Sequence, residues 1–417
     1  MSKFFFRTLK FILISLSIIL FFIFFSLLWN YLNGDALPNA DHLNPVSTEI
    51  YDDRYTGHIK KAKNILKQRS QKFHAPGYSI SVGVNNEVVW SEVYGYANLE
   101  NQTPLTIQSK FPIGSLSKPL TATAAMRLFE DGVIDLQTDI CEIVPEFPKK
   151  PYKISLEHLL SHRSGIRHYH TKFKWPPPYF TIDLHVDDDF SNSEQRLGLF
   201  SHDSLLFQPG TEYSYSTFGY TLVGEAMAKA TNVNFLDLMG ALIFEPLGMS
   251  STGADYIDKP LSERVTSYNK TIIGKRVEIA PDENCSYKWA GGGFLSTSKD
   301  LAKFGLALTN GQIIKDSSFK SMLRPISPYE NSPFPQFHGM GWNFYKLASG
   351  NTLVNHGGSP TGGQASMVMI PEAKVVVVVL TNSYIYGSLP LKIVATKIAQ
   401  EFSKSLKNNS SLSISID

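Results

Sequence analysis

A serine and a lysine three residues apart stand where an apolar stretch gives way to a helical pattern. Residues 111–119 read FPIGSLSKP, so Ser115 and Lys118 would share one face of a helix's first turn. Pro119 suits that turn because its missing N–H would have no helical partner there. An amine that burial keeps neutral can accept a serine proton, and free N–H groups at a helix N-terminus can stabilise an oxyanion. The stretch is therefore a candidate nucleophile site.

The spacing alone is not specific. The same Ser-x-x-Lys pattern begins at three other serines, Ser267, Ser296 and Ser317. An alternative interpretation makes Ser115 or Ser117 a helix N-cap and leaves Lys118 in solvent. The catalytic interpretation therefore depends on partners elsewhere in the chain.

Two further motifs follow in order, Tyr215-Ser216-Thr217 and His356-Gly357-Gly358. With Ser115-Leu116-Ser117-Lys118 they resemble the serine β-lactamase and penicillin-binding-protein family, whose motifs are S-x-x-K, Y-x-N and K-T-G or H-x-G. The tyrosine motif is similar to the branch of class C β-lactamases and D-alanyl-D-alanine carboxypeptidases. The resemblance covers roughly residue 59 to the end, and three stretches are similar to the family's animal mitochondrial members: 164–169, 215–220 and 286–294.

This resemblance implies a role for each motif residue. Ser115 would be the acylated nucleophile, and Lys118 would accept or relay its proton. Tyr215 would serve as a base, either as phenolate or through hydrogen bonding, and later activate water. His356 takes the place of the third-motif lysine, where it would hold positive charge near Tyr215 or orient a substrate carboxylate, depending on its protonation. The backbone N–H groups of Ser115 and Ser359 would form the oxyanion hole.

The resemblance also places Thr217, Gly357 and Gly358 beside the substrate, and two of these depart from the family pattern. Thr217 stands where many relatives have Asn, which removes an amide that can contact a substrate's acylamino group. Gly357 replaces the usual Thr, which removes a hydroxyl from the strand edge. Both departures weaken the case for β-lactam recognition, and both leave the nucleophile and base intact.

The expected activity is that of a serine hydrolase acting through an acyl-enzyme on peptide-like amides or esters, as a peptidase. A β-lactamase or D-alanyl-D-alanine carboxypeptidase is the alternative within the same chemistry. A non-catalytic, tethered binding or assembly protein is the alternative of another class.

No cofactor and no metal are expected. His158 and His162 lie one helical turn apart, but the H-E-x-x-H zinc pattern fails and structural histidines are favoured.

The elements that must position these residues follow from hydrophobic periodicity. Helices are expected over 59–71, after Ser115, Ser155, Tyr215 and Thr297, and over 235–244 and 389–406; strands are expected over 78–84, 87–94, 340–346, 352–355, 365–370 and 375–380. This order predicts an α/β (α+β) protein of the β-lactamase/transpeptidase-like fold. An antiparallel sheet from both chain ends would be flanked by helices, with a mainly helical subdomain inserted at about 120–285.

The amino-acid composition indicates an ordinary globular protein. The chain has 417 residues, of which 43% are hydrophobic and 18% charged, with a formal net charge of +2. This balance argues against disorder and gives no electrostatic case for nucleic-acid binding. Two cysteines, Cys141 and Cys285, make no disulfide framework, and the sequence does not say whether they pair. Nothing in the sequence indicates an oligomeric state.

The N-terminus predicts contact with a membrane. Lys3, Arg7 and Lys10 precede an uncharged apolar run, residues 11–29, which as a helix would span about 28 Å. The expected organisation is a basic cytoplasmic segment (1–10), a transmembrane signal-anchor (11–29), a linker (30–50), the hydrolase domain (51–406) outside the cytoplasm and a flexible tail (407–417). Secretion after signal cleavage is the alternative, although no clear A-x-A-like site follows the run.

Overall fold

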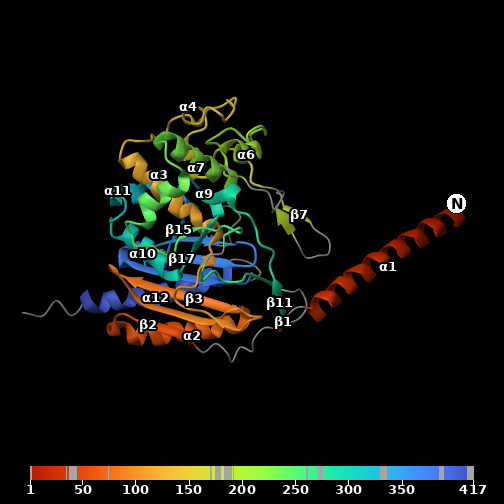
Figure 1. Cartoon of the computed structure of the whole chain (residues 1–417), viewed down its shortest axis with the longest axis horizontal. Helices are drawn as coiled ribbons and strands as arrows, with labels where there is room; N and C mark the ends of the chain where they lie inside the picture. The colour runs from red at the N-terminus through yellow and green to blue at the C-terminus, as the bar shows by residue number, and fades with distance from the viewer. Residues whose placement is uncertain are drawn as a thin grey trace, which may run out of the picture.

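The fold is built on one large antiparallel sheet (Figure 1). The computed structural model describes residues 2–410 apart from 34, 37–44, 74, 170, 174–179, 183–189, 191, 260–261, 271–275, 329–335 and 385–388. The sheet order is β13-β14-β15-β16-β17-β18-β3-β4-β2, with the short β5 paired to β4. Its strands are β2 (Pro45–Ile50), β3 (Gly77–Val84), β4 (Glu87–Asn98), β5 (Thr103–Pro104), β13 (Ser327–Pro328), β14 (Phe337–His338), β15 (Asn343–Lys346), β16 (Thr352–Gly358), β17 (Gln364–Ile370) and β18 (Val375–Thr381).

The two ends of the chain meet at the middle of this sheet. Val377 of β18 pairs with Val82 of β3 on one side and with Val368 of β17 on the other. The five consecutive valines of β18 suit a strand that is buried on both faces. The prediction of an antiparallel sheet assembled from both chain ends is confirmed.

Helices cover both faces of the sheet. Helices α2 (Thr56–Phe73) and α12 (Leu389–Ser410) contact each other and lie on one face, where Val375, Val377 and Val379 join their apolar cluster. The alternate residues of β18 point to the other face, towards α10 (Ser298–Thr309). The inner stripe predicted for the first helix is buried there, since Ile59 and Leu66 are at most 3% exposed.

The remaining helices gather beyond α10, on the side of the sheet opposite α2 (Figure 1). They are α3 (Ser117–Glu130), α4 (Ile140–Ile143), α5 (Leu156–Leu160), α6 (Ser193–Gly198), α7 (Thr217–Thr231), α8 (Phe235–Met239) with a π-helical continuation (Gly240–Phe244), α9 (Trp289–Gly292) and α11 (Asp316–Met322). Small sheets complete the fold: β6 (Phe111–Pro112), β12 (Phe294–Ser296) and β9 (Gly253–Ala254); β1 (Asp35–Ala36), β11 (Arg276–Ile279) and β10 (Tyr268–Lys270); and β7 (Thr171–Phe173) with β8 (Phe180–Ile182).

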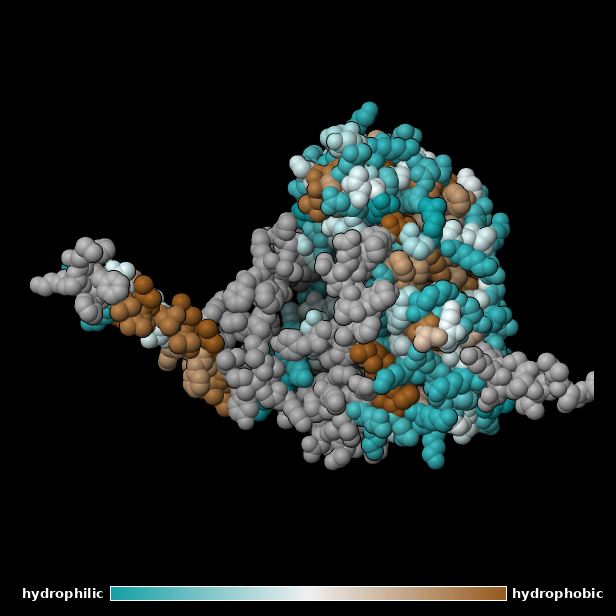
Figure 2. Space-filling model, turned by 180° about the vertical axis from the view of Figure 1, so that it is seen from behind, coloured by the Kyte–Doolittle hydropathy of each residue, from teal (hydrophilic) through white to brown (hydrophobic). Residues whose placement is uncertain are grey.

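The N-terminal helix α1 (Ser2–Asn33) projects from this body, and its middle presents a continuous apolar surface (Figure 2). Residues 7–25 have a mean hydropathy of 2.5, and none of this stretch is buried against the rest of the protein. The helix is therefore long and apolar enough to cross a membrane. The apolar run at 11–29 lies within it.

The linker expected over 30–50 is shorter than predicted, because residues 45–50 form the edge strand β2. Glu49 pairs with Ser91 of β4, and the Thr48 hydroxyl donates to the carboxylate of the fully buried Glu92 at 3.0 Å. None of the six residues of PVSTEI is buried and three of them are polar, so the segment lacks the buried apolar face that indicates a strand. At the other end, residues 407–410 still belong to α12, and the rest of the predicted tail lies outside the described residues.

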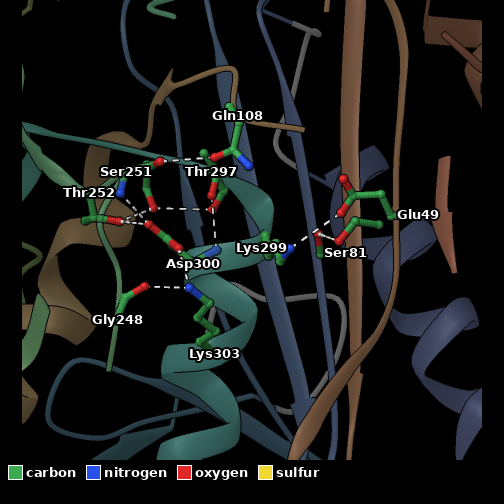
Figure 3. Close-up of polar contacts among 12 residues, drawn as sticks. Glu49, Ser81, Gln108, Gly248, Ser251, Thr252, Thr297, Lys299, Asp300 and Lys303 are labelled. Atoms are coloured by element: carbon green, nitrogen blue, oxygen red, sulfur yellow. Dashed lines mark hydrogen bonds and ion pairs between the residues drawn. The ribbon is translucent and has the colours of Figure 1, made fainter. Parts of the chain in front are cut away.

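Polar contacts at the start of α10 tie the helical region to the sheet (Figure 3). The Thr297 side chain caps the helix by accepting from the Asp300 N–H at 3.1 Å. Asp300 in turn accepts from the Ser251 N–H at 2.9 Å. Lys299 forms an ion pair with Glu49 of β2 at 3.4 Å, so the Ser-x-x-Lys match that begins at Ser296 serves structural contacts.

Candidate active site

A tight turn presents Ser115 between β6 and α3. The turn is a single 3₁₀ turn, Gly114–Leu116, and its first residue has φ = +51°, which favours glycine. A methyl group on Gly114 would lie 2.8 Å from the Pro360 nitrogen and 3.1 Å from the Ser359 nitrogen. The turn that carries Ser115 is therefore packed directly against the backbone that follows β16.

The end of β16 approaches the same turn equally closely. A methyl group on Gly358 would overlap the carbonyl oxygen of Ile113. Only glycine allows the strand to lie so near the turn. This approach brings the segment of Ser359 beside the turn of Ser115.

Lys118 is completely buried one turn after Ser115. Its Nζ lies 3.2 Å from Ser115 Oγ, 3.1 Å from Thr217 Oγ1 and 2.5 Å from the Gly291 carbonyl oxygen. Burial, and the nearby charge of Lys288, hold the pKa of Lys118 well below its ordinary value. The alternative of a solvated Lys118 does not fit this position.

Ser117 has a structural role. Its hydroxyl donates to the Gly114 carbonyl at 2.8 Å and accepts from the Phe294 N–H at 3.3 Å. These bonds close the turn and hold it against β12. They leave Ser115, and not Ser117, facing Lys118.

Tyr215 lies directly before α7 and closes the other side of Lys118. Lys118 Nζ lies 4.8 Å from the centre of the Tyr215 ring. Burial raises the pKa of the Tyr215 phenol, and a smaller opposing effect comes from its hydrogen bond with Ser115. The phenol is therefore protonated near neutral pH, which favours the hydrogen-bonding role over the phenolate.

His356 is buried on β16 and is neutral at pH 7. Burial, with a further contribution from Lys118, lowers the pKa of His356 to about 3. Its Nδ1 lies 2.7 Å from the Gly357 carbonyl oxygen, so the proton on Nδ1 donates there. Of the two roles anticipated for His356, holding positive charge does not fit this environment.

A buried cation comes instead from Lys288, which the sequence did not single out. It forms an ion pair with Glu283, and Glu283 also accepts from the Thr361 hydroxyl at 2.9 Å. Burial opposes the charge of Lys288, but Cys285, Glu283 and nearby tyrosines together raise the pKa of Lys288 well above its usual range. The pair thus links the loop before α9 to the segment that carries Ser359.

The remaining sequence candidates have clear positions. Thr217 is buried, with its hydroxyl on Lys118, while Gly357 is half-buried on β16. His158 accepts from the Ser155 N–H in a capping box, and Cys141 and Cys285 are unpaired. Within the described ranges no three His, Cys, Asp or Glu side chains lie together as metal ligands would.

Two further contributors were not assigned to the site by the sequence analysis. The Gly291 carbonyl is a backbone group, and no motif marks a backbone acceptor. His168 was not assigned to the site, yet its Nδ1 accepts from the Thr217 N–H at 3.1 Å. Its position in the sequence, 47 residues before Tyr215, gave no signal of this contact.

Comparison with known proteins agrees with this arrangement. The family model "Beta-lactamase" matches residues 62–390, so the chain belongs to the beta-lactamase family. Serine beta-lactamase-like protein LACTB, mitochondrial, of Homo sapiens is 29% identical, over 83% of this chain and 80% of the human protein.

Solved structures show the same fold. The D-amino acid amidase of Ochrobactrum anthropi SV3, in complex with L-phenylalanine amide, superimposes with a TM-score of 0.68 at 26% identity, covering 85% of this chain and 99% of the amidase. A class C beta-lactamase gives a TM-score of 0.68 at 21% identity, covering 84% and 98%. The predicted α/β fold with its antiparallel sheet is confirmed, and the family's characterised chemistry is that of serine hydrolases.

Proposed function

We propose that this protein is a membrane-anchored serine hydrolase that acts on peptide-like amides or esters through an acyl-enzyme at Ser115. The observation that carries the proposal is the position of Lys118, a fully buried amine 3.2 Å from Ser115 Oγ. Two N–H groups of a neutral amine would be used by the Gly291 carbonyl and Thr217 Oγ1. Its lone pair is then left for the proton of Ser115.

Acylation follows from these contacts. Lys118 Nζ takes the Ser115 proton as Oγ attacks the substrate carbonyl carbon. The N–H groups of Ser115 and Ser359 stabilise the negative charge that develops on the carbonyl oxygen. The carbon–nitrogen or carbon–oxygen bond then breaks, and the leaving group receives the former Ser115 proton from Lys118 through the Tyr215 hydroxyl.

Deacylation uses the same groups in reverse. A water molecule gives its proton to the Tyr215–Lys118 pair as it attacks the acyl carbon. The ester bond to Ser115 breaks and Oγ recovers a proton. The neutral phenol of Tyr215 suits this work because a hydroxyl can accept and donate a proton in one step.

The departures at Thr217 and Gly357 favour peptide-like substrates over β-lactams. The Thr217 hydroxyl already accepts a hydrogen bond from Lys118, and Gly357 has no hydroxyl to offer a substrate at the strand edge. The similarity in fold to an amidase supports an amide substrate. A β-lactamase or D-alanyl-D-alanine carboxypeptidase is the second candidate, because the nucleophile, lysine and tyrosine would serve it equally well.

The apolar surface of α1 supports anchoring (Figure 2). The basic residues before it, Lys3, Arg7 and Lys10, favour a cytoplasmic N-terminus, which would place the hydrolase domain outside the cytoplasm. Intact right-side-out membrane vesicles expose the outer face to added protease. Degradation of the hydrolase domain in sealed vesicles supports this orientation, and full protection until detergent is added contradicts it.

The nucleophile is tested with a fluorophosphonate probe on the full-length chain in detergent. Wild type should label and Ser115→Ala should not, while Ser317→Ala, in an unrelated Ser-x-x-Lys match, should label at the wild-type rate. Equal labelling of wild type and Ser115→Ala would exclude Ser115 as the nucleophile. Hydrolysis of a chromogenic cephalosporin compared with a panel of peptide amides then separates the two candidate activities.

A further inference from the structure

Two histidines, the buried His162 and the half-buried His168, hold the segment that carries Tyr215. We propose that His162 and His168 are positioning residues that set the orientation of Tyr215 for proton transfer, a role that depends on the proposed hydrolase function. They bracket one loop, residues 162–168, which we call the histidine clamp. The clamp contacts the backbone on both sides of Tyr215.

Four hydrogen bonds join the clamp to residues 214–217. The His162 carbonyl accepts from the Ser214 N–H at 2.9 Å, and His162 Nδ1 accepts from the Ser216 N–H at 3.1 Å. The Ser216 hydroxyl donates to the Arg167 carbonyl at 2.8 Å, and His168 Nδ1 accepts from the Thr217 N–H at 3.1 Å. The backbone on either side of Tyr215 is therefore fixed by one loop.

The same two imidazoles enclose the Tyr215 ring. The His162 ring lies 4.3 Å from it, centre to centre, at an interplanar angle of 35°. The His168 ring lies 5.5 Å away at 89°, an edge-to-face arrangement. The phenol is thus held from two directions while its hydroxyl faces Ser115.

Both histidines must be neutral to do this. Each uses Nδ1 as an acceptor, which places its proton on Nε2. Burial lowers the pKa of His168 to about 3 and that of His162 well below its ordinary value, with Lys118 adding to both effects. Uncharged rings support Tyr215 without placing a positive charge beside the neutral amine of Lys118.

The backbone conformation of His162 is unusual and is further evidence that this residue has a specific positioning role. His162 has φ = +59°, in the left-handed region that most side chains avoid. This conformation allows its carbonyl and its ring to reach the residues on either side of Tyr215. The strained position lies next to the reacting groups rather than in a surface turn.

His158 provides a matched control in the same segment of the chain. Its Nδ1 also accepts a backbone N–H, from Ser155 at 3.3 Å, within the capping box of α5. Replacing His158 therefore removes the same kind of hydrogen bond without touching Tyr215.

The test measures the second-order rate of fluorophosphonate labelling of the full-length chain, with melting temperatures recorded in parallel. We expect His168→Leu to label about 10- to 100-fold more slowly, because the Thr217 N–H loses its acceptor and Tyr215 loses its support. His168→Asn should recover to within about threefold of wild type, because Asn Oδ1 can replace Nδ1 as the acceptor. His158→Leu should label at the wild-type rate even where its melting temperature falls as far.

A double-mutant cycle separates positioning from general stability. In the Tyr215→Phe background, His168→Leu should slow labelling by less than about twofold, because its effect acts through the hydroxyl that is already gone. An equal loss in both backgrounds, or His168→Asn as slow as His168→Leu, would overturn the proposal. If Tyr215→Phe labels too slowly to measure, the comparison of Asn with Leu at residue 168 decides alone. Failure of the hydrolase proposal appears differently, as labelling that survives Ser115→Ala.

Discussion

At the scale of single residues, Lys118 shows how burial can turn a lysine into a candidate base. Placing an amine where it is fully excluded from water disfavours its charged form, so the folded protein keeps a base where the unfolded chain would have a cation. The contacts with Gly291 and Thr217 give that base a fixed direction. The same burial that keeps the amine neutral also makes Lys118 destabilising wherever the unfolded chain would protonate it.

Because burial lowers the pKa of Lys118, the stability of the folded protein should depend on pH with a defined sign. Between the lowered pKa of folded Lys118 and the ordinary lysine value of 10.5, the unfolded chain binds the extra proton, so Lys118 makes stability rise with pH. We expect the unfolding free energy of wild type, relative to Lys118→Met, to rise by up to about 1.4 kcal/mol per pH unit in this window. Denaturant unfolding of both proteins from neutral to alkaline pH measures it; a pH-independent difference would show that Lys118 is charged when folded.

At the scale of elements, the site depends on one close approach between the Ser115 turn and the end of β16. Gly114 and Gly358 allow two backbones to meet where any side chain would separate them. The sheet thereby sets the position of Ser359, and α3 sets that of Ser115. In the proposed mechanism, neither element alone would supply both N–H groups of the oxyanion hole.

Gly114→Ala tests this contact. The new methyl group would lie 2.8 Å from the Pro360 nitrogen, so we expect the two backbones to move apart and labelling of Ser115 to slow by about 10-fold or more. Gly132→Ala is the matched control, because Gly132 also has a positive φ (+70°) but no atom within 4 Å of the added group. It should cost about 1 kcal/mol of stability and leave labelling unchanged. Wild-type labelling by Gly114→Ala would contradict the proposed oxyanion hole.

At the scale of the whole molecule, the beta-lactamase family domain and the apolar part of α1 do not pack against each other. The two chain ends close one sheet whose faces are covered by α2, α12 and α10, while residues 7–25 of α1 bury none of their surface in the protein. An uncovered apolar surface of this length is stable in a bilayer and not in water.

Removal of residues 1–33 should therefore change location and not chemistry. We expect the full chain to sediment with membranes and to need detergent for release, whereas the shortened chain should stay in the soluble fraction and label at the wild-type rate. Fractionation followed by probe labelling measures both. Membrane association that persists without α1, or loss of labelling in a folded shortened chain, would contradict this division.

The sequence by itself determined the elements with strong periodicity and the motifs with fixed spacing. The valines of β18 and the stripe of Ile59, Ala62 and Leu66 predicted their elements because burial of apolar side chains sets local patterns. Ser115 and Lys118 could be paired because a helix fixes the relation of residues three apart.

Only the tertiary structure decided which distant groups meet and which protonation states they adopt. The neutral state of His356, the charged Lys288, the Gly291 carbonyl on Lys118 and the grip of His162 and His168 on Tyr215 all depend on burial and on contacts across many residues. The edge strand β2 was missed for the same reason, since its pairing with β4 and not its own pattern makes it a strand. Chain-distant contacts and local dielectric are properties of the folded molecule, so no pattern of neighbouring residues encodes them directly.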